Sequence, residues 1–161
     1  MLIVALLVVT LAEPAYAFFP IIKPFDIICS NLRWLKKVVL GGADVNETTE
    51  KEMTPLMYAV RYSSPEIVIY LIEEGARVNA KNIQSGLTVL MYAVLGNNPE
   101  VVEVVLENGA EVNEQGPAGM TALDIAQARW GEDDQQVSSL LKKYGAEKRQ
   151  SKVTYVPKVL K

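Results

Sequence analysis

Apolar positions along this chain follow the spacing of helices. One segment carries apolar residues at i, i+1, i+4 and i+5, namely Ile67, Val68, Leu71 and Ile72. These positions share one face of an α-helix, so the spacing predicts a helix with a single buried stripe. A second segment repeats the stripe, at Val101, Val102, Val105 and Leu106. Each unit has too few apolar residues to bury its own stripe, which predicts that neighbouring units stack.

An internal period of about 34 residues organises these segments. The run TPLMYAV at 54–60 recurs as TVLMYAV at 88–94, and more loosely as TALDIA at 121–126. A second marker of the form Gly-Ala-x-Val-Asn keeps the same register, at 42–46, 75–79 and 109–113. Gly-Ala-Glu at 145–147 closes the series. Two markers in step indicate a repeat protein.

Capping residues predict a helix, a turn, a second helix and a loop in each period. Thr54 is a helix N-cap, and Pro55 fits the first turn because its missing N–H costs nothing there. Ser64-Pro65-Glu66 and Asn98-Pro99-Glu100 start the second helices in the same way. Gly75 and Gly109 supply the left-handed residue that ends them. In the first unit, residues 31–40 predict an outer helix, while Pro20 and Pro24 leave little room for an inner one.

These residues resemble the ankyrin-repeat family, in a form typical of secreted or periplasmic bacterial proteins. The segments that carry the resemblance are 54–60, 64–80, 88–94, 98–114 and 121–126. It implies an all-α solenoid of stacked antiparallel helix pairs with projecting loops, about 3.5 repeats long. The family's histidine is replaced by Met57, Met91 and Asp124, which predicts the loss of a hydrogen bond. The last unit has three extra residues, around 130–134.

We divide the chain on these patterns. A signal peptide at 1–17 and a linker at 18–25 precede a repeat domain at 26–147, and a basic tail at 148–161 is expected to be disordered in isolation. The repeat domain comprises a degenerate N-terminal cap, two good repeats and a C-terminal cap, at 26–52, 53–86, 87–119 and 120–147.

The N-terminal segment predicts export. Residues 2–11 form an apolar run that is short for a membrane helix, which needs about 20 residues, and suits a signal-peptide core. Ala15-Tyr16-Ala17 supplies the small residues of a cleavage site, so we predict cleavage between Ala17 and Phe18. No Lys or Arg precedes the run. The alternatives are a buried N-terminal helix and an uncleaved anchor that faces outside the cytoplasm, with the tail on lipid headgroups.

Composition removes most catalytic chemistry. The 161 residues include no histidine and one cysteine, so no imidazole-based relay, internal disulfide or Cys-rich zinc site can form. The acidic triplet at 132–134 lacks the spaced ligands of a calcium loop. Cys29 fits a buried small hydrophobe, with pairing between chains as the alternative. We expect no cofactor, no metal, no small-molecule substrate and no enzymatic activity.

Charge is distributed unevenly along the chain. The formal net charge of −3 argues against non-specific binding to nucleic acid. Residues 44–114 carry twelve acids and four bases, whereas the tail carries five bases and no acid. The acidic segment at 44–114 favours basic partners, or it only keeps the solenoid soluble.

The resemblance implies binding of a protein partner through the loop tips, at 47–53, 81–87 and 115–120, and through the concave face of the inner helices. The candidate contacts are Lys51, Met53, Gln84, Leu87 and Met120 on the loops, and Arg61, Tyr62, Leu95, Arg129 and Trp130 at the inner-helix ends. Tyr, Trp and Arg are frequent interface hot spots, although Tyr62 and Trp130 could simply cover the turns between helices. Tyr58 and Tyr92 are expected in the core. The sequence predicts an exported, non-catalytic protein-binding module.

Overall fold

The computed structural model describes residues 31–130 and 135–147. The predictions for the N-terminal segment, Cys29, the acidic triplet and the tail lie outside these residues. Within them the chain forms seven α-helices, one 3₁₀ helix and no strand beyond an isolated bridge between Lys81 and Thr88. The α-helices are α4 (Leu32–Leu40), α5 (Pro55–Tyr62), α6 (Pro65–Glu73), α7 (Val89–Gly96), α8 (Pro99–Glu107), α9 (Ala122–Trp130) and α10 (Gln135–Lys143), and the 3₁₀ helix is η1 (Pro117–Gly119).

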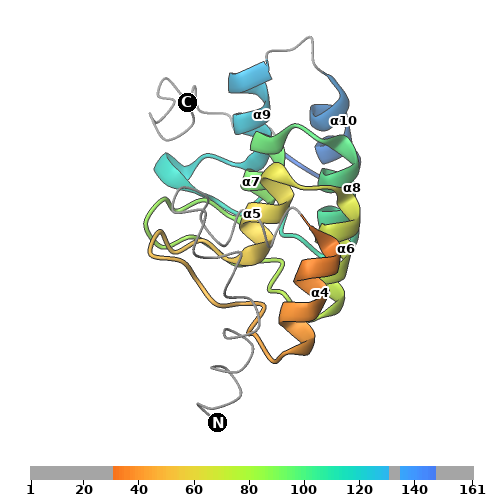
Figure 1. The fold of residues 1–161 in the computed structure, drawn as a ribbon. Helices are drawn as coiled ribbons and strands as arrows, with labels where there is room; N and C mark the ends of the chain where they lie inside the picture. The colour runs from red at the N-terminus through yellow and green to blue at the C-terminus, as the bar shows by residue number, and fades with distance from the viewer. Residues whose placement is uncertain (1–30, 131–134, 148–161) are drawn as a thin grey trace.

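The helices stack in two rows, with the loops projecting away from the outer row (Figure 1). The inner row consists of α5, α7 and α9, and the outer row of α6, α8 and α10, with α4 at one end. Each inner helix also packs on the outer helix that follows it in sequence. The predicted all-α solenoid of helix pairs is confirmed. Four residues separate α9 from α10 but only two separate α5 from α6. The extra residues predicted around 130–134 lie almost entirely outside the described residues.

The predicted caps start the helices. The Thr54 side-chain oxygen accepts a hydrogen bond from the Met57 N–H, and Asn98 Oδ1 accepts one from the Glu100 N–H. Ser64 differs, because it makes no side-chain bond to the helix backbone. Its hydroxyl instead bonds the Glu66 carboxylate, which lowers the pKa of Glu66. The charged form of Glu66 is thus favoured at this helix start, a contribution that is lost as pH falls through that lowered pKa.

The residues that replace the family's histidine fill its position in two ways. Met57 and Met91 are fully buried, so packing takes the place of a hydrogen bond. Asp124 accepts from both the N–H and the hydroxyl of Thr121, and the Thr121 oxygen accepts from the Asp124 N–H in return. This reciprocal capping satisfies two backbone N–H groups at the start of α9.

The centre of the core is α7, whose side chains from Val89 to Leu95 are all buried. It is covered because α5, α8 and α9 all pack against it. Gly96 ends this helix next to the carbonyl oxygens of Val60 and Arg61, at 2.8 and 2.9 Å from where a Cβ atom would lie. Glycine is therefore required for the close approach of α5 and α7.

An asparagine ties each repeat to the next one. The Asn79 side-chain amide donates to the Gly109 carbonyl at 3.0 Å, and its oxygen accepts from the Glu111 N–H at 2.9 Å. Asn46 and Asn113 make the same pair of bonds one repeat earlier and one repeat later. The acceptor glycine has a left-handed backbone (φ 85° at Gly109), as predicted for the residue that ends each outer helix. The recurrent asparagine is thus an inter-repeat tether.

We predict that Asn79→Ala lowers the free energy of unfolding by about 1–2 kcal/mol, because two hydrogen bonds between repeats are lost. The measurement is urea unfolding followed by circular dichroism. Asn108→Ala is the control, since the Asn108 amide bonds only the Val104 carbonyl within its own repeat. An equal loss in the two variants would contradict a special role for the tether.

Candidate protein-binding surface

Backbone hydrogen bonds close each of the three predicted loop tips. The Thr49 N–H donates to the Met53 carbonyl at 3.0 Å, and the Asn82 N–H donates to the Leu87 carbonyl at 2.9 Å. In the third loop the Gly116 N–H donates to the carbonyl of residue 120 at 2.8 Å. Each tip is therefore a closed turn whose shape is set by its own main chain.

Asn82 fastens the second loop to the first. Its side chain is only 2% exposed, and its amide donates to the carbonyls of Lys51 and Glu52 at 2.8 and 2.9 Å. Its oxygen accepts from the Ser85 N–H. Gln84 adds a bond to the Glu50 carbonyl at 3.0 Å. Sequence reasoning missed Asn82, because no other repeat has an asparagine at that position.

Lys81 fastens the second loop to the third. Its ammonium group donates to the Gln115 carbonyl at 2.7 Å and to a Glu114 carboxylate oxygen at 3.1 Å. Both partners lie in the next repeat, so the side chain bridges two loops. The three loop tips form one hydrogen-bonded surface.

The structure divides the loop candidates into exposed and buried side chains. Lys51 and Gln84 are exposed and Met53 is half-buried. Leu87 and Met120 are 2% and 0% exposed, so their assignment as partner contacts was wrong for this surface. Both residues directly precede an N-cap threonine, where the chain enters an inner helix and an apolar side chain fills the seam between repeats.

Two of the five inner-helix candidates, Arg61 and Tyr62, lie at the end of α5. Tyr62 is 64% exposed, and the Arg61 guanidinium lies 5.3 Å from the centroid of its ring. The Tyr58 ring, half-buried, lies 5.3 Å from that of Tyr62. This cluster presents aromatic and cationic groups to solvent at one end of the inner row. Such groups commonly anchor protein interfaces.

The corresponding positions in later repeats differ. Leu95 is 5% exposed and belongs to the core, so it too was wrongly assigned as a contact. Arg129 is exposed, and the side chain of Trp130 lies outside the described residues. Tyr92 is buried as expected, with its hydroxyl 3.0 Å from that of Ser85 under the second loop.

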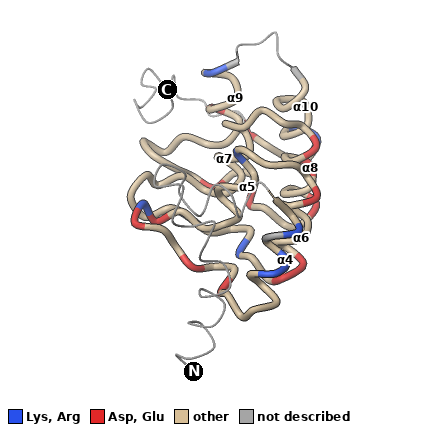
Figure 2. Tube along the Cα trace, in the orientation of Figure 1, with Lys and Arg blue, Asp and Glu red and all other residues tan. Residues whose placement is uncertain are grey.

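Charge on the outer helices differs between the ends and the middle of the row (Figure 2). Neither α6 nor α8 carries a basic residue, whereas α4 and α10 carry lysines. Lys143 on α10 pairs with Glu103 on α8 at 3.3 Å, and Lys36 on α4 lies 5.2 Å from the Tyr70 ring on α6. Partial burial and the nearby Glu74 raise the pKa of Tyr70. Many of the acidic residues of the segment 44–114 therefore lie on α6 and α8, in the middle of the outer row.

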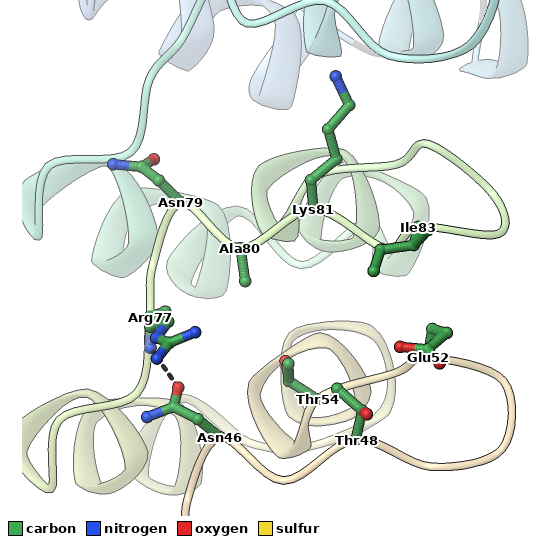
Figure 3. Close-up of a pocket in the computed structure, with 9 residues that line it drawn as sticks. All are labelled: Asn46, Thr48, Glu52, Thr54, Arg77, Asn79, Ala80, Lys81 and Ile83. Atoms are coloured by element: carbon green, nitrogen blue, oxygen red, sulfur yellow. Dashed lines mark hydrogen bonds between the residues drawn. The ribbon is translucent and has the colours of Figure 1, made fainter.

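A groove of about 630 Å³ separates the first loop from the second (Figure 3). At one end the Arg77 N–H donates to Asn46 Oδ1 at 2.9 Å. The lining residues are Asn46, Thr48, Glu52, Thr54, Arg77, Asn79, Ala80, Lys81 and Ile83. Four of these, Thr48, Glu52, Lys81 and Ile83, lie in the predicted loop tips, but none of the nine is one of the predicted contact residues. The groove arises from the stacking of repeats, which one repeat alone does not reveal.

Within the described ranges, no group of three or more His, Cys, Asp or Glu side chains is placed to hold a metal ion. None of the helices placed by the structure has the length and apolar character needed to cross a bilayer.

Stacked helix pairs, tethered at each step and carrying a row of linked loops, define a solenoid repeat protein. A family model described as ankyrin repeats in three copies matches residues 27–116, more than half of the chain. The chain belongs to the ankyrin-repeat family. A comparison with curated proteins found no match. Ankyrin repeats are generally protein–protein interaction modules and are typically non-catalytic.

We predict that Asn82→Ala loosens the first loop, because the carbonyls of Lys51 and Glu52 lose their donor. The cost in unfolding free energy is about 1–3 kcal/mol, as for a buried hydrogen-bonded group. Hydrogen exchange should show faster exchange of the Glu52 and Met53 amides. Gln84→Ala is the control, since it removes one exposed bond to the same loop. Unchanged protection in Asn82→Ala would contradict the tether.

Proposed function

We propose that this chain is a non-catalytic module, exported from the cytoplasm, that binds a protein partner through its loop tips and the concave face of its inner helices. The observation that carries the proposal is the linkage of the three loops by Asn82, Gln84 and Lys81. A linked, closed-turn surface loses little conformational entropy when a partner docks, so more of the contact energy remains as affinity.

The proposed contact surface comprises the described candidates with solvent access. They are Lys51, Met53 and Gln84 on the loops, and Arg61, Tyr62 and Arg129 on the inner helices; Trp130 remains a candidate from sequence. Tyr62 is the strongest of them because its ring is large and exposed and contacts both the tilted Tyr58 ring and the Arg61 guanidinium. An aromatic anchor that is ordered before binding costs less to immobilise.

We predict that Tyr62→Ala and Arg61→Ala weaken partner binding about ten-fold or more, as hot-spot truncations do, with little change in melting temperature. The partner is first isolated by affinity capture on the 161-residue chain, and its affinity for each variant is then measured by calorimetry. Ile69→Ala is the matched control, because Ile69 is 40% exposed on the outer helix α6.

Two results would contradict this assignment. A large fall in melting temperature alongside the loss of binding would make the Tyr62 cluster structural. An equal effect of Ile69→Ala would place the interface on the outer face.

Export is supported by the apolar run at 2–11 and the small residues before Phe18. We predict that the protein released from cells begins at Phe18, which N-terminal sequencing tests. The control is Ala17→Arg, which removes the small residue at the cleavage position and should leave the leader attached. An intact N-terminus in a washed membrane pellet would instead favour the anchored form with its basic tail on lipid headgroups.

A further inference from the structure

The groove between the first and second loops is a fixed channel, because hydrogen bonds between repeats hold both of its walls. Asn46 bonds the backbone of the second repeat, and Asn82 bonds the Lys51 and Glu52 carbonyls of the first. Ala80 and Thr54 lie between these tethers (Figure 3). Its volume of about 630 Å³ falls in the range of ligand-binding pockets, roughly 300–1,000 Å³.

The two ends of the groove differ in charge. Arg77 is exposed, and its guanidinium has no hydrogen-bond or ion-pair partner among the residues that the structure places. Lys81 directs its ammonium group away from the groove, to Glu114 and Gln115 in the next repeat. Glu52 stands at the opposite end, near Ile83 (Figure 3). A ligand that carries one acidic group at the Arg77 end fits this arrangement, and a second acid beside Glu52 would be repelled.

The Ile83 end offers an apolar contact. Ile83 lines the groove and is 84% exposed, the largest exposed fraction of any large hydrophobic side chain in the described ranges. Exposed aliphatic surface gains about 25 cal/mol for each Å² that a partner covers. An aliphatic side chain of a ligand would therefore be favoured here.

The main chain along the groove favours an extended ligand. Lys81 faces Thr88 in an antiparallel bridge whose flanking hydrogen bonds belong to Ala80 and Asn82. The N–H and C=O of Lys81 therefore point away from Thr88. No residue in the described part of the chain bonds either group. An extended peptide can bond such open backbone groups, as a free strand does at a sheet edge.

We propose that this groove binds an extended segment of the protein partner, with an acidic side chain paired to Arg77 and an aliphatic side chain packed against Ile83. The proposal rests on the proposed protein-binding function and adds to it the site and the chemistry of the bound segment. The segment runs with its acid toward the outer helices and its aliphatic residue toward the loop tips.

The test is selection of random linear peptides, displayed on phage, against the immobilised 161-residue chain. Selected peptides are synthesised with a fluorophore, and their affinities are measured by fluorescence polarisation. We expect an Asp or Glu and an aliphatic residue at a constant spacing. Arg77→Glu should weaken binding about ten- to a hundred-fold, the effect of losing one charge-assisted contact. Ile83→Ser should weaken it about ten-fold.

Matched controls separate the groove from bulk charge and hydrophobicity. Lys142→Glu makes the same type of charge reversal as Arg77→Glu, at an exposed position on α10. Leu40→Ser removes an 83% exposed aliphatic side chain from the end of α4, which does not line the groove. Neither control should change peptide affinity. A second selection against Arg77→Glu should yield peptides with Lys or Arg in place of the acid. That result would show that the variant is folded and that the charge at residue 77 determines the charge of the side chain it binds.

Other results would overturn the proposal. Peptides that bind wild type and Arg77→Glu equally, or that depend on Tyr62 alone, would place linear recognition elsewhere and leave the protein-binding function intact. Failure to select any peptide would also reject the groove. If no peptide is selected, a partner whose capture depends on Tyr62 would still support the proposed function. If no such partner is captured either, the groove and the proposed function are both rejected.

Discussion

The whole structure depends on the fact that no single repeat can bury its own apolar residues. The helix α7 shows the consequence, since its side chains are buried on every side only because α5, α8 and α9 surround it. Stacking alone would allow the repeats to slide, and the asparagine tethers fix their relative position. Apolar burial supplies the stability, while directional hydrogen bonds set the register on which the loops and the groove depend.

The period, the helix pairs and most caps could be predicted from sequence, because they are local patterns that repeat. Contacts between repeats could not be. Leu87 and Leu95 look like ordinary loop and helix-end residues, and only stacking shows that they are buried. Gly96 looks like part of an exposed helix end, yet it lies against the backbone of Val60 and Arg61 in α5 with no room for a Cβ atom. Asn82 has no counterpart in the neighbouring repeats, so no periodic signal could single it out.

Comparison of the repeats with one another separates stability from recognition. Positions that keep the same residue, such as the Thr caps, the Met of the inner helices and the Asn tethers, are buried or bonded to the next repeat. Several of the positions that differ between repeats reach solvent or bridge loops. Tyr62 corresponds to Gly96, Arg77 to Glu111, and Lys81 to Gln115. The frame is thus shared by all repeats, and each repeat contributes its own side chains to the surface.

This separation also explains why the groove and the exposed aromatic cluster lie within residues 46–83. The groove needs two tethered loops and an unpaired cation. Between the second and third loops the cation, Lys81, is already paired with Glu114. The exposed aromatic cluster needs a large residue at the end of an inner helix, and at the end of the next inner helix, α7, that position is Gly96, which close packing requires to be small. The acidic side chains of α6 and α8 neither line the groove nor belong to the aromatic cluster, so their field acts on the approach of a partner more than on its bound contacts.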